Sequence, residues 1–343
     1  MSTSESSCAP PPEWTTVNED ELPEESRLVL SSLPREKRWA EPYLYQYQGF
    51  WHPAWKFNLV LDCQKNFQAK DSDVLVASYP KCGTTWLKSL MFATVNRHRF
   101  PPLGKNHPLL AKNSHELVPF LEFDGDPNNR IGDIVSPHRL ISTHLPYVSL
   151  PKSALDSGCK IVYICRNPKD TFISLWHHMD KIKLPDTGIN GFEEAFNMFC
   201  RGVSLYGPFW DHVLSYWKES LERPENVLFL KYEEIKAQPE FHVRRIAEFI
   251  GCPFSPAEEE ARSGSGSGSG LGSEVVDEIV RLCCFENLSN LEVNKSGRSS
   301  IGKFNELFRK AQVGDWKNYL TPAMAARLDH ITKEKFHGFG LDL

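Results

Sequence analysis

The sequence predicts a single α/β domain with a central parallel sheet flanked by helices and a P-loop-like anion-binding loop. Short, apolar, β-branched runs alternate with helical patterns, and polar residues follow each run directly. A turn that contains Lys and Gly follows the first run and leads into a helical pattern. Continuous apolar strands of this kind are typical of a sheet that is covered on both faces.

The N-terminal segment differs in composition from the chain that follows it. Residues 1–26 contain seven acids, no Lys or Arg, and three consecutive prolines at 10–12. Such a stretch buries too little apolar surface to order itself. We therefore expect residues 1–38 to form an acidic, largely disordered tail and residues 39–343 to form the folded domain. The aromatic-rich run 39–57 should pack on the core or cover a pocket, and core packing is the commoner role.

Charge, cysteine content and hydropathy exclude several classes of protein. A net charge of -5 gives no general attraction to nucleic acid or anionic membranes, so we expect neither as a partner. The nine cysteines form no Cys-x-x-Cys pair, which is typical of reduced thiols rather than disulfides or a zinc site. The N-terminus lacks a signal-peptide pattern, and no run approaches 18 apolar residues. These features predict a cytoplasmic protein.

Four runs are the predicted strands, and the carboxyl ends of parallel strands are where ligands bind in such sheets. They are Val74–Ser78, Leu140–Thr143, Ile161–Cys165 and Val227–Leu230. A Ser/Gly repeat at about 262–273 should form a flexible surface loop, of natural or engineered origin.

The loop Tyr79–Trp86 follows the first strand and indicates an anion-binding site. Its backbone N–H groups, the positive end of the following helix, Lys81 and two hydroxyls can all face one anionic group. The loop is not the Gly-x-x-x-x-Gly-Lys motif of nucleoside triphosphatases, because Lys81 precedes Gly83. Taken alone, such a turn also has a purely structural interpretation.

The residues after the next strands indicate that the site works without metal. P-loop enzymes place a magnesium-binding carboxylate after a neighbouring strand. Here Arg166 follows one strand, and Lys231 and Tyr232 follow another. Arg166, together with Ser174 in the following helix, suits a second phosphate.

His144 follows the strand Leu140–Thr143 and is a candidate general base. An isolated His is more often structural, but one beside a transferable group can take a proton from a hydroxyl near neutral pH. His177 and His178 are adjacent in a predicted helix and do not face one another, so we interpret them as a coincidence rather than a metal site. The basic segment 308–317 would be a solvated turn if taken alone, but it can also hold a phosphate.

Together these four segments resemble the cytosolic sulfotransferases that use 3′-phosphoadenosine 5′-phosphosulfate (PAPS), and most closely their plant branch. The resemblance runs from about Trp51 to the C-terminus. It implies transfer of a sulfuryl group to a hydroxyl of a small acceptor, with 3′-phosphoadenosine 5′-phosphate (PAP) as product. It assigns the general base to His144 and the cation on the leaving phosphate to Lys81.

The resemblance also assigns the donor contacts. Lys81, Cys82 through its backbone, Gly83, Thr84 and Thr85 would bind the 5′-phosphosulfate. Trp86 would stack on adenine and Tyr232 would approach its edge. The 3′-phosphate would be held by Arg166, Ser174, Arg309 and Lys310, within a signature that includes Phe308 and Ala311.

Three positions depart from the family pattern. Cys82 replaces a Ser or Thr, and Cys284 stands where Ser is common, which puts one hydroxyl contact to PAPS in doubt. Ala311 replaces a Gly, which would cost about 1 kcal/mol if the position needs a positive φ.

The acceptor is expected to be a hydroxylated plant metabolite such as a steroid, flavonoid, desulfoglucosinolate or hydroxyjasmonate. The candidate pocket residues are Trp51, His52, Phe120, Phe123 and Tyr147, because an apolar wall suits such acceptors. We expect a monomer or weak dimer. A PAPS-binding protein without catalysis and a nucleotide-dependent kinase are the alternative functions.

Overall fold

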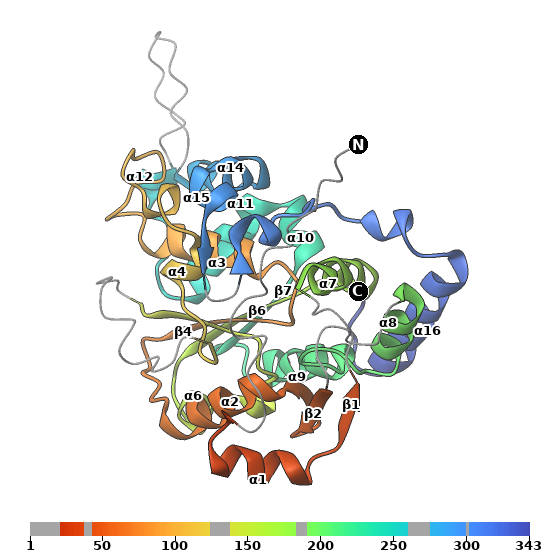
Figure 1. Ribbon diagram of the computed structural model, residues 1–343. Coiled ribbons are helices and arrows are strands. Elements are labelled where there is room, and N and C mark those ends of the chain that lie inside the picture. The colour runs from red at the N-terminus through yellow and green to blue at the C-terminus, as the bar shows by residue number, and fades with distance from the viewer. Residues whose placement is uncertain (1–20, 38–42, 124–137, 183–190, 260–274, 300–301) are drawn as a thin grey trace, which may run out of the picture.

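The computed structural model describes residues 21–37, 43–123, 138–182, 191–259, 275–299 and 302–343 (Figure 1). At its centre lies a four-stranded parallel sheet with strand order β5-β4-β6-β7. The strands are β4 (Val74–Ser78), β5 (Leu140–Thr143), β6 (Lys160–Cys165) and β7 (Val227–Lys231). They coincide with the four predicted strands, so the α/β prediction is confirmed.

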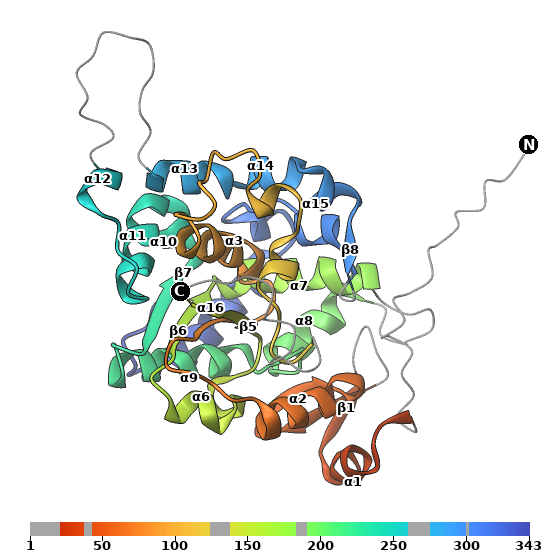
Figure 2. The same ribbon diagram turned by 90° about the vertical axis from the view of Figure 1, so that its left-hand side faces the viewer.

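Two layers of helices cover the sheet (Figures 1 and 2). Alternate side chains of each strand enter different cores, as with Val74 and Val76 on one face of β4 and Leu75 and Ala77 on the other. The first layer consists of α3 (Thr84–Val95), α4 (Ser114–Leu117), α10 (Tyr232–Ala237), α11 (Pro239–Phe249), α12 (Pro256–Glu259), α13 (Val275–Leu282), α14 (Phe285–Asn290) and α15 (Glu292–Ser296). The second consists of α2 (Ala54–Asn66), α6 (Lys152–Asp156), α7 (Pro168–Ile182), α8 (Phe192–Cys200), α9 (Phe209–Glu222) and α16 (Pro322–Phe336).

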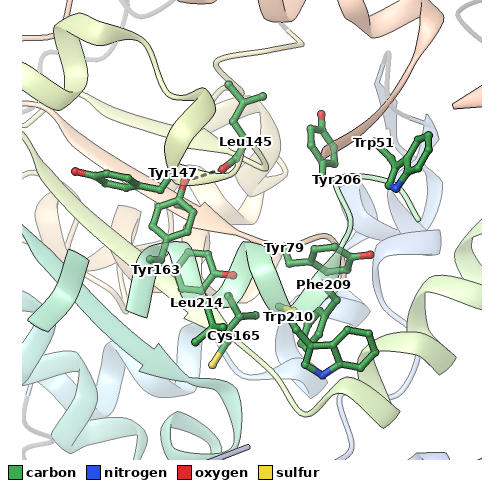
Figure 3. Close-up of a cluster of buried hydrophobic side chains, with 14 of the residues drawn as sticks. Trp51, Tyr79, Leu145, Tyr147, Tyr163, Cys165, Tyr206, Phe209, Trp210 and Leu214 are labelled. Atoms are coloured by element: carbon green, nitrogen blue, oxygen red, sulfur yellow. Dashed lines mark hydrogen bonds between the residues drawn. The ribbon is translucent and has the colours of Figure 1, made fainter. Parts of the chain in front are cut away.

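The core between the sheet and the second helix layer is rich in aromatic side chains (Figure 3). Tyr163 of β6 stacks on Tyr216 of α9, with ring centroids 4.1 Å apart. The Tyr216 hydroxyl donates a hydrogen bond of 2.7 Å to the carbonyl of Leu145, just beyond β5. Helix α9 therefore fixes the backbone that follows β5, at the edge of the sheet where the site lies.

Ordered structure begins earlier than predicted. Helix α1 (Glu24–Ser32) and strand β1 (Arg35–Lys37) lie within the segment 1–38 that was expected to be disordered. Strand β1 pairs with β2 (Tyr43–Tyr47), which pairs with β3 (Phe50–Pro53) in a small antiparallel sheet. Leu30 of α1 packs in a cluster with Phe57 of α2. The prediction is wrong for residues 21–37 because a few apolar side chains there reach a partner that composition does not reveal, whereas residues 1–20 lie outside the described residues.

Small elements complete the chain, and the expected Ser/Gly loop at 262–273 lies outside the described residues. The strands β8 (Arg298–Ser299) and β9 (Gly302–Lys303) form a two-stranded ladder. The 3-10 helices are η3 (Pro108–Leu110), η5 (Tyr147–Ser149), η7 (Phe304–Leu307) and η8 (Asp315–Asn318). Among the helices that the structure describes, none has the length and apolar character needed to cross a membrane.

Candidate active site

The loop between β4 and α3 has the strained backbone of a built binding site. Lys81 has a φ of 69° and Gly83 a φ of 108°, both in the left-handed region. A Cβ at Gly83 would lie 2.8 Å from the ring of Tyr232, so glycine is required here by both conformation and space. Strain at a non-glycine residue such as Lys81 persists only where its surroundings hold it, and it is frequent at functional sites.

Lys81 is a cation with a perturbed proton affinity. Burial lowers its pKa to about 8, and the positive charges of Lys181, Arg309 and Arg166 act in the same direction. A bound anion would reverse this effect, because it favours the charged ammonium. The side chain is therefore suited to a site that is completed by a strongly anionic ligand.

One cavity, with a volume of about 290 Å³, gathers most of the predicted donor-binding residues. Those that line it are Lys81, Gly83, Thr84, Thr85, Trp86, Arg166, Ser174, Tyr232, Cys284, Phe308, Arg309, Lys310 and Ala311, and the candidate general base His144 lines it too. Cys82 lies outside its wall: its thiol is buried, 3.6 Å from the hydroxyl of Thr171. If Cys82 contacts a ligand, the contact is therefore made by its backbone.

The basic end of the cavity is held together by acids. The carboxylate of Asp315 accepts from Lys310 Nζ at 2.9 Å and from Arg309 Nη1 at 2.5 Å. Asp170 of α7 accepts from the backbone N–H groups of Gly314 and Trp316, at 2.7 and 2.9 Å. These bonds clasp the C-terminal segment against α7 and bring its cations beside Arg166.

Arg166 connects this end to the aromatic part of the cavity. Its guanidinium lies 4.5 Å from the ring centroid of Tyr232 and donates to the carbonyl of Gln312 at 2.8 Å. The rings of Tyr232 and Trp86 meet edge to face, with centroids 5.5 Å apart. A planar base can stack on such rings while its phosphates reach the cations.

Hydrogen bonds at the backbone N–H, the backbone carbonyl and one ring nitrogen orient His144. Its Nδ1 lies 2.8 Å from the carbonyl oxygen of Ser78, which can only accept. The proton is therefore on Nδ1, and Nε2 carries the lone pair. Its backbone N–H donates to Glu122 Oε1 at 2.7 Å, and its carbonyl accepts from His212 Nε2 at 2.9 Å.

Burial lowers the pKa of His144 well below its ordinary value, and the nearby cations Lys56 and Lys88 add to the effect. The imidazole is therefore neutral near pH 7. Its ring packs beside Phe120, at a centroid distance of 4.9 Å. A neutral, oriented imidazole on a cavity wall is the form that a general base requires.

Of the five predicted acceptor-pocket residues, Phe120 and Phe123 line the cavity, whereas Trp51, His52 and Tyr147 do not. Trp51 and His52 point into the buried core beside Tyr206, and His52 lies 5.4 Å from that ring. The hydroxyl of Tyr147 accepts from Arg223 at 3.1 Å, away from the cavity. Aromatic side chains on short buried strands served packing, which residue type alone does not distinguish from a pocket wall.

The sequence interpretation missed several residues that line the cavity. They include Trp55, Lys56, His115, His177, His178, Met179, Lys181 and Leu205. Adjacent histidines were interpreted as a coincidence, yet both line the cavity because α7 runs along its wall. Lys56 lies within the aromatic-rich run 39–57, and its ammonium lies 3.5 Å from the ring centroid of Phe123.

Ala311 adopts a backbone conformation with a positive φ, which costs free energy for any residue other than glycine. Its φ is 51°, in the left-handed region. We expect Ala311→Gly to tighten PAP binding by up to about fivefold, because strain of about 1 kcal/mol in the binding conformation is removed. Gln48 also has a φ of 51° but does not line the cavity, so Gln48→Gly is the matched control. Calorimetry that shows equal PAP affinity for Ala311→Gly and the original chain would contradict the prediction.

No group of three or more His, Cys, Asp or Glu side chains that could hold a metal ion occurs in the described ranges. The absence of magnesium chemistry stays a prediction, which is tested below.

Comparison with known proteins identifies the family. The profile of the sulfotransferase domain matches residues 71–340. Cytosolic sulfotransferase 5 of Arabidopsis thaliana is 48% identical over 94% of this chain and 97% of its own length. Cytosolic sulfotransferase 12 of the same plant is 46% identical over 95% and 96%.

Solved structures agree as well. A candidate steroid sulphotransferase of Arabidopsis thaliana superposes with a TM-score of 0.73 at 42% identity, over 95% of this chain and 98% of that one. A mouse sulfotransferase in complex with PAP superposes with a TM-score of 0.65 at 27% identity, over 86% and 94%. The chain therefore belongs to the sulfotransferase family, whose members are enzymes that transfer sulfuryl groups, and within it to the plant cytosolic branch.

Proposed function

We propose that this protein transfers the sulfuryl group of PAPS to a hydroxyl of a small organic acceptor in the cytosol, with His144 as general base and Lys81 on the leaving phosphate. The observation that carries the proposal is the tautomer of His144. Its Nδ1–H is tied to the Ser78 carbonyl, which leaves the Nε2 lone pair for the acceptor in a cavity that Lys81 also lines.

The proposed reaction is a direct in-line transfer. Nε2 of His144 takes the proton of the acceptor hydroxyl while the acceptor oxygen forms a bond to sulfur. The bond between sulfur and the bridging oxygen of the 5′-phosphate breaks, and PAP leaves. The negative charge that develops on this phosphate is stabilised by Lys81 and the backbone N–H groups at the start of α3.

The donor's other end fits the opposite part of the cavity. Arg166, Ser174, Arg309 and Lys310 are proposed to bind the 3′-phosphate, and Trp86 and Tyr232 the adenine. The mouse relative with bound PAP supports a nucleotide of this type. Phe120, Phe123, Trp55, Leu205 and Met179 give the acceptor part an apolar wall beside His144.

The acceptor is proposed to be a hydroxylated plant metabolite, such as a steroid, flavonoid, desulfoglucosinolate or hydroxyjasmonate. Incubating the purified protein with labelled PAPS and a panel of these acceptors tests this. Label transfer to any hydroxyl supports the proposal, and PAP-binding protein that labels no member of the panel contradicts the acceptor assignment.

A nucleotide-dependent kinase and a PAPS-binding protein without catalysis are the two alternatives. Thermal shift without added metal separates the first, since PAPS should raise the melting temperature and ATP should not. Single-turnover transfer separates the second, since a binding protein without catalysis would transfer no label from PAPS to an acceptor. Such a protein needs neither an oriented imidazole nor a cation at the leaving group.

We expect full activity in EDTA. The cavity supplies positive charge for the donor's phosphates through Lys81, Arg166, Arg309 and Lys310. We therefore expect the chemical step to need no magnesium. The measurement is the initial rate with and without EDTA at fixed ionic strength. A rate that falls with EDTA and returns with magnesium would rule out the metal-free mechanism.

A further inference from the structure

A buried hydrogen-bonded chain lies beside the cavity and is not used by the mechanism above. It links Lys88 of α3, His115 of α4 and Thr85 at the start of α3. Helices α3 and α4 lie side by side (Figure 1). Lys88 Nζ lies 3.0 Å from His115 Nδ1, and His115 Nε2 lies 2.9 Å from Thr85 Oγ1. Lys88 is fully buried, yet Thr85 and His115 both reach the cavity wall.

The chemistry of the groups fixes the direction of this chain. An ammonium group only donates, so Nδ1 of His115 accepts from Lys88. Burial, together with the charge of Lys88, lowers the pKa of His115 well below its ordinary value, so the ring is neutral. A neutral ring that accepts at Nδ1 carries its proton on Nε2, which therefore donates to Thr85 Oγ1.

The consequence falls on the Thr85 hydroxyl. Its oxygen already accepts from His115, so its own hydrogen points away from His115. The side chain lines the cavity, whose other residues here include Lys81 and Gly83 of the phosphate loop. A chain of this kind polarises each member in turn, and the buried cation at its far end makes the last hydroxyl a stronger donor.

We propose that Lys88 and His115 are positioning residues that fix the Thr85 hydroxyl as a hydrogen-bond donor to the anionic phosphosulfate of the donor substrate. The inference goes beyond the contact of Thr85 itself, which rests on the proposed function. It assigns a task to a lysine that does not line the cavity and to a histidine that is not the proposed general base.

The same contacts also stabilise the fold, so the test must separate the two roles. Ser114 donates to the Thr85 carbonyl at 3.1 Å, and the ring of His115 stacks on Phe120 at 5.3 Å. Loss of these contacts would lower the melting temperature. A purely structural role of these residues would not determine the tautomer of His115. It would also not make the effects of the Lys88 and Thr85 substitutions on PAP binding depend on each other.

The first experiment measures the His115 tautomer by ¹⁵N NMR of the protein without ligand. We expect the neutral Nε2–H form at pH 7 in the original chain and a loss of that preference in Lys88→Met. An imidazolium, or a neutral ring protonated on Nδ1, would overturn the proposal. The outcome does not depend on PAPS, so it is distinguishable from a failure of the proposed function.

The second experiment is a double-mutant cycle read by PAP calorimetry and by kinetics. Lys88→Met and Thr85→Val should each weaken PAP binding by about tenfold or more, the effect of losing a hydrogen bond to a charged group. Each should raise the KM for PAPS more than it lowers kcat. The double variant should be no weaker than Thr85→Val alone, because the relay acts only through that hydroxyl.

Lys152→Met removes an exposed lysine and is the control for the substitution itself. It should leave PAP affinity unchanged. Additive losses in the cycle, or a Lys88→Met variant that lowers the melting temperature and leaves PAP affinity intact, would reduce Lys88 to a structural residue and overturn the proposal.

Discussion

Replacing His144 with alanine should reduce turnover by about 10²–10⁴ and leave PAP affinity nearly unchanged, because a general base acts in the transfer step and not in donor binding. The geometry supports this separation. The ring is held by the Ser78 carbonyl and packs on Phe120, whereas the residues proposed to bind the 3′-phosphate come from the loop after β6, from α7 and from the C-terminal segment.

Two measurements check this expectation: calorimetry with PAP, and transfer at saturating PAPS with an acceptor found in the screen. His330→Ala is the matched control, since His330 is an exposed residue on α16 whose Nε2 lies 3.3 Å from the Glu334 carboxylate. A His144→Ala variant that kept more than about a tenth of the original turnover would show that another group takes the proton.

Replacing Lys81 with alanine should lower kcat by about 10²–10³, with a smaller effect on PAPS binding. A cation aimed at the leaving oxygen matters most as negative charge develops in the transition state. Single-turnover rates at saturating PAPS, compared with PAP affinity, measure the two effects separately. Wild-type turnover at saturating PAPS would remove Lys81 from the leaving-group role.

The pKa of Lys81 also predicts a pH dependence of donor binding. With the site empty, burial lowers this pKa to about 8, so the ammonium loses its proton as pH rises above that value. Binding of the anion requires the charged form and must then take up a proton. PAP affinity should therefore fall as pH rises beyond about 8, and the Lys81→Ala variant should lack this slope.

The sequence predicted the sheet, and it placed the candidate donor-binding residues at the edge of that sheet, because both signals are local. A buried strand appears as an unbroken apolar run, and the residue that follows it, such as Lys81, His144 or Arg166, must lie at the edge where parallel strands end. The chemistry of the loops could therefore be assigned before any tertiary contact was known.

The acceptor part depends on packing between distant segments and was predicted only in part. Trp51 and Phe123 look alike as isolated aromatic residues, yet one fills the core and the other lines the cavity. Lys88 gave no signal, because a lysine within a helical pattern is expected to face solvent. In the folded chain its ammonium lies 3.0 Å from Nδ1 of His115, 27 residues away in sequence, and 3.4 Å from the ring centroid of Phe120.

The clasp between Asp170 and the backbone at 314–316 has a consequence for biosynthesis. The sheet, the phosphate loop and His144 all precede residue 232, whereas Phe308, Arg309 and Lys310 belong to the last tenth or so of the chain. A polypeptide emerging from the ribosome can thus assemble its central layers well before its nucleotide site exists. Only when the C-terminal segment reaches Asp170 does the nascent protein complete this wall of the cavity, so the proposed 3′-phosphate site forms only when translation is almost at its end.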